Sequence, residues 1–120
     1  PHLVALCGDQ VVGWCDIVRY TKSTMVHRGA VSMGLLDNFR GQGLGSALLT
    51  QAMAMSWAAG FKRIELIVRG DNQHALALYR KAGFAQESLR RKAFLVDGHY
   101  YDLIDMAILH PDLETHEATQ

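Results

Sequence analysis

Three alternating glycines in residues 40–46, with the sequence RGQGLGS, constrain this chain more than any other feature. The run lies between a β-rich stretch at 31–36 and an amphipathic helical stretch at 44–59. Glycine lets the backbone turn tightly and approach a ligand without a Cβ clash. The first amides of a helix lack intrahelical acceptors, and the helix dipole makes that end positive. The pattern therefore predicts an anion site, usually for phosphate, to which Arg40 adds a permanent cation.

Two common phosphate-binding patterns do not fit this run. A P-loop needs a Gly-Lys-Ser/Thr ending, and no Lys follows any of these glycines. A Rossmann fingerprint needs a third glycine where Ser46 stands. The pattern that remains, Arg40-x-x-Gly43-x-Gly45, resembles the pyrophosphate loop of the GNAT superfamily of N-acetyltransferases, which bind acetyl-CoA there. The alternative for the run alone is a glycine-rich turn that only caps a helix.

A second pattern follows the first at the separation that is usual in the GNAT superfamily. Asp71 and Asn72 are an N-cap signal before a helix predicted at 73–81, and Gly83 is a C-cap signal. The spacing of six residues resembles the second GNAT signature: Asn72, Ala75, Tyr79, Lys81, Gly83 and Phe84. The later run Asp-Gly-His-Tyr at 97–100 is similar to the branch of ribosomal-protein, polyamine and amino-acid acetyltransferases.

The resemblance implies an α/β fold with a mixed sheet, the GNAT acyl-CoA N-acyltransferase architecture, over residues 1–110, followed by a polar tail at 111–120. Strands are expected at 2–7, 11–18, 27–36, 63–68, 84–87, 93–96 and 100–109. Gly34 within a strand predicts a bulge or a close backbone approach. An apolar stripe is expected on the first helix: Leu44, Ala47, Leu48, Met55 and Ala58.

The family pattern begins with a further strand and one or two helices that are missing here, so the sequence is either a fragment or that of a naturally short protein. The first hairpin would then be an exposed sheet edge, which is prone to association. We therefore expect another chain to cover this edge, as a homodimer or in a swapped arrangement.

The composition excludes several other classes of protein. The chain has 120 residues, 49% of them hydrophobic and 20% charged, with a formal net charge of zero, which favours one globular domain without a nucleic-acid footprint. No apolar run or signal-peptide pattern indicates a membrane, so a cytoplasmic location is expected. Free thiols are expected at Cys7 and Cys15, although a disulfide across the hairpin is left open. The histidines are scattered, so no metal site is expected.

The resemblance also implies the residues that bind acetyl-CoA. The phosphates would be held near Arg40 by loop and helix residues: Gly41, Gln42, Gly43, Gly45 and Ser46. The backbone of Leu35 would pair with the pantetheine amides like an added strand, and an amide near Gly34 and Leu35 would hold the oxyanion. Asn72 would cap its helix, bond the pantetheine, or do both.

Catalysis is assigned to two side chains. Tyr79 matches the family tyrosine that donates a proton to the leaving thiolate, against the alternative of a core tyrosine. Glu65 is the nearest candidate for a base, against a salt-bridged strand residue, and a base-free route is also open. Core packing is the alternative to an acceptor-side role for Phe94, Tyr100 and Tyr101. The predicted function is acetyl transfer from acetyl-CoA to a primary amine of a small molecule, amino acid or protein N-terminus. The rivals are a silent CoA-binding module and a structural interaction protein.

Overall fold

The computed structural model describes residues 1–113, which contain six strands, the helices α1 and α2, two 3₁₀ turns and helical residues at 111–113. The strands form one sheet in the order β1-β2-β3-β4-β6-β5. This mixture of sheet and helices is the predicted α/β class. The chain divides into two compact units, Pro1–Ile64 with Leu109–Gln120, and Glu65–Ile108, which we describe in turn. The tail predicted at 111–120 lies mostly outside the described residues.

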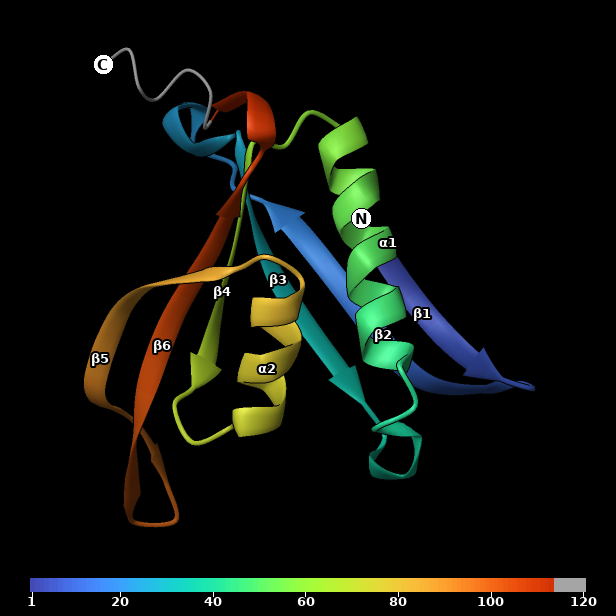
Figure 1. Ribbon diagram of the computed structural model, residues 1–120, viewed down its shortest axis with the longest axis vertical. Coiled ribbons are helices and arrows are strands. Elements are labelled where there is room, and N and C mark those ends of the chain that lie inside the picture. Colours follow the sequence, from blue (N-terminus) through green and yellow to red (C-terminus); the bar gives the residue numbers. More distant parts are fainter. Residues whose placement is uncertain (114–120) are drawn as a thin grey trace. The chain divides into compact units, whose positions relative to one another are not determined.

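The first unit begins with the predicted hairpin. Strand β1 (His2–Cys7) runs antiparallel to β2 (Gln10–Arg19), and Cys7 pairs with Gln10 across a two-residue turn. Strand β3 (Arg28–Leu35) pairs with the other edge of β2 in an unbroken antiparallel register. The helix α1 (Leu44–Ala58) lies against β1 and β2 (Figure 1). Because β1 has β2 alone as a neighbour, it is the edge strand that the sequence predicted.

Alternation along β2 decides which side chains enter the core of the first unit. Cys15 and Ile17 are 0% and 2% exposed and point to the same side as Gly13, where an added Cβ would lie 3.3 Å from the Leu48 side chain of α1. Trp14 and Val18 point to the other side and are 37% and 63% exposed. The face of β2 opposite α1 therefore carries apolar side chains that the described residues leave accessible.

The buried face of α1 differs from the predicted stripe. Its buried residues are Gly45, Leu48, Leu49, Ala52, Met53 and Ser56. Met55, which we expected in the core, is 43% exposed, whereas Ser56 is fully buried and donates to the Ala52 carbonyl at 2.9 Å. The prediction was wrong because apolar residues occur all round this helix, so their spacing does not define one face. Gly60 follows the helix with φ of +93°, in agreement with the predicted ending.

The second unit contains most of β4 (Arg63–Arg69), then α2 (Gln73–Lys81), β5 (Ala85–Val96) and β6 (His99–Leu109). Gly83 has φ of +106° beyond the end of α2, and the Phe84 amide donates back to the Tyr79 carbonyl at 3.0 Å. This is the predicted glycine C-cap. Strands β5 and β6 form an antiparallel hairpin (Figure 1).

The two short strands predicted at 84–87 and 93–96 are one strand, β5. Its register against β6 shifts between Arg90 and Phe94, and Lys92 within this shift has φ of +52°. The Lys92 amide donates to the Asp102 carboxylate at 2.9 Å, which replaces a ladder hydrogen bond at the bulge. Polar residues at the bulge interrupted the strand pattern in the sequence, but not the strand itself.

The two cysteines are free thiols, Cys7 exposed and Cys15 buried. They cannot bridge the hairpin because Cys7 pairs with Gln10 beside the turn, whereas Cys15 pairs with Leu3. Burial, with a smaller effect of the neighbouring Asp16, raises the pKa of the Cys15 thiol to about 11. Among the described residues, neither helix has the length and apolar character needed to cross a membrane.

Candidate functional site

A short turn connects the end of β3 to the glycine run at residues 40–46. After Leu35 the chain forms a 3₁₀ turn, η2 (Asp37–Phe39), and the loop then enters α1 at Leu44. Gly41 and Gly43 have φ of +76° and +79°. L-residues rarely adopt these conformations, so glycine is needed here for the backbone turn. An added Cβ at either position would meet no atom within 4 Å, so the outer side of the loop is open.

The loop presents a row of backbone donors. No backbone carbonyl among residues 1–113 accepts a hydrogen bond from the amides of residues 41–46, and the bond from Ala47 to the Gly43 carbonyl, at 3.0 Å, is the first of α1. Gly43 is the N-cap and supplies no side-chain acceptor. These donors stand at the positive end of a 15-residue helix, in an open glycine loop. The residues therefore fit the diphosphate group that the sequence predicted.

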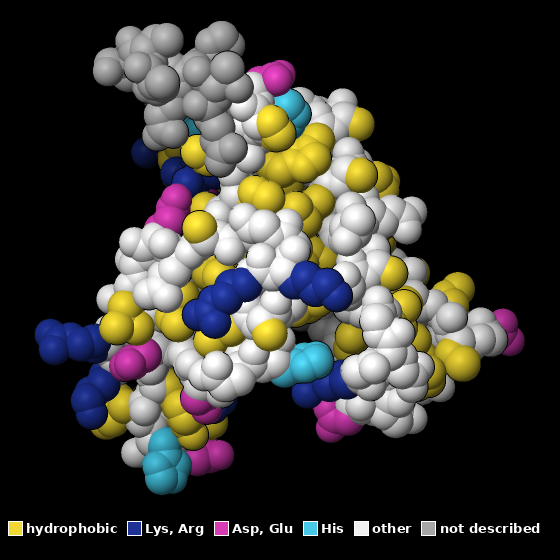
Figure 2. Space-filling model, in the orientation of Figure 1, with side chains coloured by type: hydrophobic (Ala, Val, Ile, Leu, Met, Phe, Trp, Pro, Cys, Tyr) yellow, Lys and Arg dark blue, Asp and Glu magenta, His cyan; other side chains and the backbone are white. Residues whose placement is uncertain are grey.

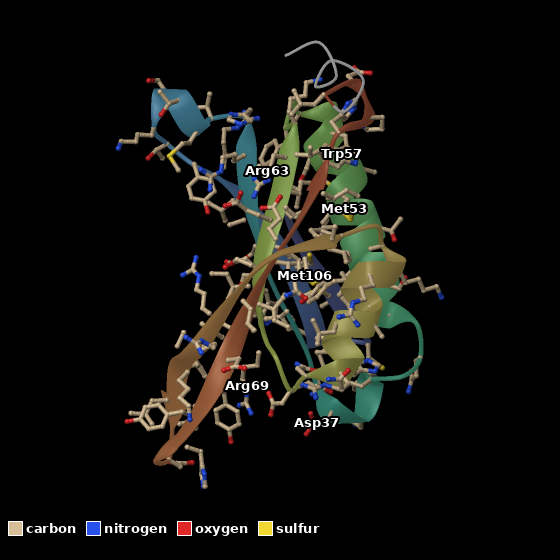
Figure 3. All side chains as sticks on the ribbon, turned by 60° about the vertical axis from the view of Figure 1, so that its left-hand side comes forward. Asp37, Met53, Trp57, Arg63, Arg69 and Met106 are labelled. Atoms are coloured by element: carbon tan, nitrogen blue, oxygen red, sulfur yellow. The ribbon has the colours of Figure 1, made fainter. Side chains whose placement is uncertain are left out.

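Arg40 stands at the start of this loop. Its Nη1 lies 3.4 Å from the Asp37 carboxylate, in an ion pair whose side chains are 58% and 93% exposed. Figure 3 shows Asp37 in the turn that precedes the loop. Exposed pairs of this kind are weak, so the guanidinium can exchange Asp37 for a phosphate at little cost. The side chain of Gln42 donates to the Asn38 carbonyl at 3.3 Å, which leaves its backbone amide as its contribution to the loop.

Leu35 and Gly34 differ in the direction of their backbone groups. The Leu36 amide donates to the Val12 carbonyl of β2 at 2.9 Å. Because amides alternate along a strand, the Leu35 amide faces away from β2 and the Gly34 amide faces toward it. Leu35 therefore has the better direction for pairing with a ligand. The register of β2 and β3 shows no bulge at Gly34, so of our two expectations for this glycine only the close approach is found.

Two predicted residues lie on α2 or at its start, in the second unit. The Asn72 side chain accepts a hydrogen bond from the Ala75 amide at 3.1 Å, which confirms the predicted N-cap. No hydrogen bond from its side-chain amide nitrogen is found within residues 1–113, so this group can donate to a ligand. Tyr79 is half-buried and packs edge-on against Phe84, with ring centroids 6.0 Å apart. Its ring is thus anchored within its own unit.

The candidate base, Glu65, lies in the part of β4 that belongs to the second unit and is half-buried. The predicted site residues therefore fall into two sets. The phosphate loop and Leu35 belong to the first unit. Glu65, Asn72 and Tyr79 belong to the second.

One polar cluster in the second unit was not predicted. Arg69 makes two hydrogen bonds to Asp71, at 3.0 and 2.8 Å, and its guanidinium lies 3.8 Å from the Tyr101 ring centroid. The hydrogen bonds from Arg69 lower the pKa of Asp71 and raise that of Arg69. The cluster fixes the turn before Asn72, and Figure 3 shows Arg69 at the end of β4. The Arg-Gly-Asp spacing was its signal in the sequence.

The aromatic residues of the β5–β6 hairpin are not core residues. Phe94 is 42% exposed and Tyr100 is 60% exposed. Tyr101 is half-buried beneath Arg69. Basic and apolar side chains both gather on the surface of this hairpin (Figure 2). The structure thus rejects core packing for Phe94 and Tyr100 and leaves them accessible to a ligand.

Comparisons with known proteins agree with this geometry. The model of the acetyltransferase (GNAT) family matches residues 1–84. The N-alpha-acetyltransferase RimI of Mycobacterium tuberculosis is 34% identical over 82% of this chain and 62% of its own length, and the L-amino acid N-acetyltransferase AaaT of Escherichia coli is 32% identical over 88% and 66%. A GNAT phosphinothricin acetyltransferase from Sinorhizobium meliloti, solved in complex with AcCoA, is 25% identical with a TM-score of 0.85, over 91% of this chain and 60% of that one.

The chain thus spans about 60 to 66% of the length of these relatives. The family model covers well over half of the chain, and it includes both the phosphate loop and the helix with Asn72 and Tyr79. The solved relative has the same fold over nearly the whole of this chain. The chain belongs to the GNAT family of acetyltransferases.

Proposed function

We propose that the protein is an acetyl-CoA-dependent N-acetyltransferase that acts on a primary amine by direct attack. The observation that carries this proposal is the row of amides at residues 41–46, at the N-terminus of α1 and beside Arg40, from which no backbone carbonyl of residues 1–113 accepts a hydrogen bond. The names of the relatives support it, because they include acetyltransferases of amino acids and of N-alpha amines. The acceptor would be a small molecule, an amino acid or a protein N-terminus.

When bound, acetyl-CoA supplies an activated acetyl thioester. Arg40 and the loop amides would bind its phosphates through charge-assisted hydrogen bonds. The Leu35 backbone would pair with the amides of the pantetheine arm. The Asn72 amide nitrogen would add a further donor, because its oxygen is already used by the helix cap.

Two side chains would move protons in this reaction. Tyr79 would donate its phenolic proton to the departing sulfur, since an ordinary tyrosine is protonated at neutral pH. Glu65 would accept the proton that the amine loses, directly or through water. The Leu35 amide would supply the hydrogen bond that stabilises negative charge on the reacting carbonyl oxygen, and one such donor is typically worth about 3 kcal/mol.

Calorimetry with CoA and thiol-release assays with acetyl-CoA test the proposal together. Arg40→Ala should weaken CoA binding severalfold, whereas Arg91→Ala, an exposed arginine on β5, should not. Binding of CoA without turnover across a broad amine panel would indicate a silent CoA-binding module. No binding of CoA, or binding unchanged in Arg40→Ala, would remove the phosphate loop from the proposal.

A homodimer formed at the β1 edge is part of the same proposal. Strand β1 ends the sheet, and Val4 and Leu6 on it are 47% and 61% exposed. Pairing of two β1 edges would use the unpaired backbone groups and cover these side chains. Light scattering at micromolar concentration tests this, and a monomer would contradict it.

A cytoplasmic location is also proposed, and the free thiols of Cys7 and Cys15 suit a reducing compartment. Fractionation of the source cells would test it. Recovery of the protein outside the cytoplasm would contradict it.

A further inference from the structure

A pocket in the first unit has no role in the function proposed above. Its volume is about 210 Å³, and it opens between the first half of β2 and the end of β3. Seven residues line it, all apolar or glycine: Val11, Val12, Gly13, Trp14, Gly34, Leu35 and Leu36. The indole N–H of Trp14 is the one polar side-chain group of this lining. The pocket therefore suits an uncharged, apolar group with at most one hydrogen-bond acceptor.

Trp14 and Gly34 build the pocket as a pair. They lie directly opposite each other in the β2–β3 register. A Cβ on Gly34 would lie 3.0 Å from the indole Nε1 and 3.2 Å from Cε2, so glycine allows the ring to rest against the β3 backbone. Val12 is 2% exposed and Gly13 is buried, and they form the floor. Val11 and Leu36, at 52% and 42% exposure, form the rim.

The pocket shares residues with the segment that is proposed to hold the reacting thioester. Leu35 and Gly34 line it, and the Leu35 amide is the proposed donor to the carbonyl oxygen. An acetyl group carries a single methyl, which would leave most of the volume empty. A cavity of about 150 Å³ holds benzene, so this pocket accommodates a side chain the size of leucine or methionine. The other reactant, the amine, carries a side chain that would fill this volume.

We propose that this pocket binds the apolar side chain of the acceptor, and that Trp14 determines specificity for it. The proposal rests on the proposed acetyltransferase function and names its substrate class: amino acids or peptide N-termini with an uncharged apolar side chain. Acidic side chains and polyamines are excluded, because the lining offers no charged partner and an unpaired buried charge is costly.

The expected selectivity follows from the area that the pocket removes from water. Each methylene buried in a fitting pocket changes kcat/KM by roughly fourfold, from about 0.8 kcal/mol per CH₂. L-Leucine should therefore exceed L-alanine by about 50-fold, with L-methionine similar to leucine. L-Glutamate and spermidine should fall below alanine.

The test measures thiol release from acetyl-CoA by the full chain with these five amines. Trp14→Ala should reduce the leucine-to-alanine ratio to less than about fivefold, and Trp14→Phe should give an intermediate ratio. The KM for acetyl-CoA should change less than twofold in both variants, because the indole is not part of the proposed CoA site. Trp57→Phe is the matched control. Trp57 lies on α1 and packs edge-on against His110, so this substitution should leave the ratio unchanged.

An independent readout separates failure of this inference from failure of the proposed function. The chain contains two tryptophans, so the Trp57→Phe variant reports Trp14 emission alone. With CoA present, N-acetyl-L-leucine should change this emission saturably and N-acetyl-L-glutamate should not. This result would support the pocket even if no amine were acetylated, which would refute only the transfer reaction.

Three results would overturn the inference while the proposed function stands. The first is a leucine-to-alanine ratio that is unchanged in Trp14→Ala. The second is a rate that depends on the length of the acyl chain of the CoA thioester and not on the side chain of the amine. The third is Trp14 emission that does not respond to either acetylated amino acid. Each would show that the acceptor side chain binds elsewhere.

Discussion

The glycine at the start of α1 gives the sharpest test of the phosphate loop. Gly43 is the N-cap with φ of +79°, and a Cβ there would meet no atom within 4 Å. Gly43→Ala therefore creates no clash with the described residues, and its effect on stability comes from the backbone alone. The left-handed conformation costs a residue with a Cβ about 1 to 2 kcal/mol. We expect the free energy of unfolding to fall by about that amount.

The same substitution should also weaken CoA binding, and the loss of binding free energy should exceed the loss of stability. Relief of the strained φ rotates the amides that follow, and the new methyl group enters the open side of the loop. Loss of one charge-assisted hydrogen bond, worth about 1.5 to 3 kcal/mol, corresponds to a Kd that rises about 10- to 100-fold. Binding of pantetheine, which lacks the diphosphate, should remain at the level of the unmodified chain.

Gly8→Ala is the matched control. Gly8 has φ of +61° in the β1–β2 turn, and a Cβ there also meets no atom within 4 Å. The Gly8→Ala variant should lose a comparable free energy of unfolding, measured by urea titration with circular dichroism as the signal. It should bind CoA normally in calorimetry. If Gly43→Ala bound CoA within twofold of the unmodified chain, or if Gly8→Ala weakened CoA binding equally, the reasoning about the loop would be refuted.

Three further predictions concern other residues. Tyr79→Phe should lower kcat at least tenfold with little change in CoA affinity, since general acid catalysis typically contributes 10²–10⁴-fold, and a kcat within twofold would refute the role. Asn72→Ala should lower the unfolding free energy by about 1 kcal/mol and Asn72→Asp should restore most of it in urea titrations, because the carboxylate also caps the Ala75 amide. The raised pKa of Cys15, about 11, means that the folded chain keeps this proton while the unfolded chain loses it, so stability should fall between about pH 9 and 11. Unfolding curves across this range should show the decline, and Cys15→Ala should remove it; an equal decline in that variant would contradict the assignment.

Local features of the site were predictable because they depend on a few neighbouring residues. Gly43 and Gly83 adopt positive φ where the sequence placed a helix start and a helix end. Asn72 caps α2 as its position before an apolar repeat indicated. In each case the chemistry of one side chain, or the lack of one, decides the backbone without help from distant parts of the chain.

Features that depend on register were not predictable in the same way. Gly34 was expected to mark a bulge or a close approach, and the choice depended on Trp14, twenty residues earlier, lying directly opposite. The buried face of α1 also could not be read from spacing, since Met55 and Met53 are equally apolar but only Met53 is buried. Packing against β1 and β2 selects between such residues, and their order along the chain does not.

The sequence by itself determined the glycine loop, the helix caps, the hairpins and the family, because these follow from backbone preferences over short distances. The tertiary structure decided which face of α1 is buried, that the Arg69 guanidinium lies over the Tyr101 ring, and that Trp14 rests on Gly34 to form a pocket. These arrangements bring together residues far apart in the chain, and the pairing of strands and the filling of a core select them.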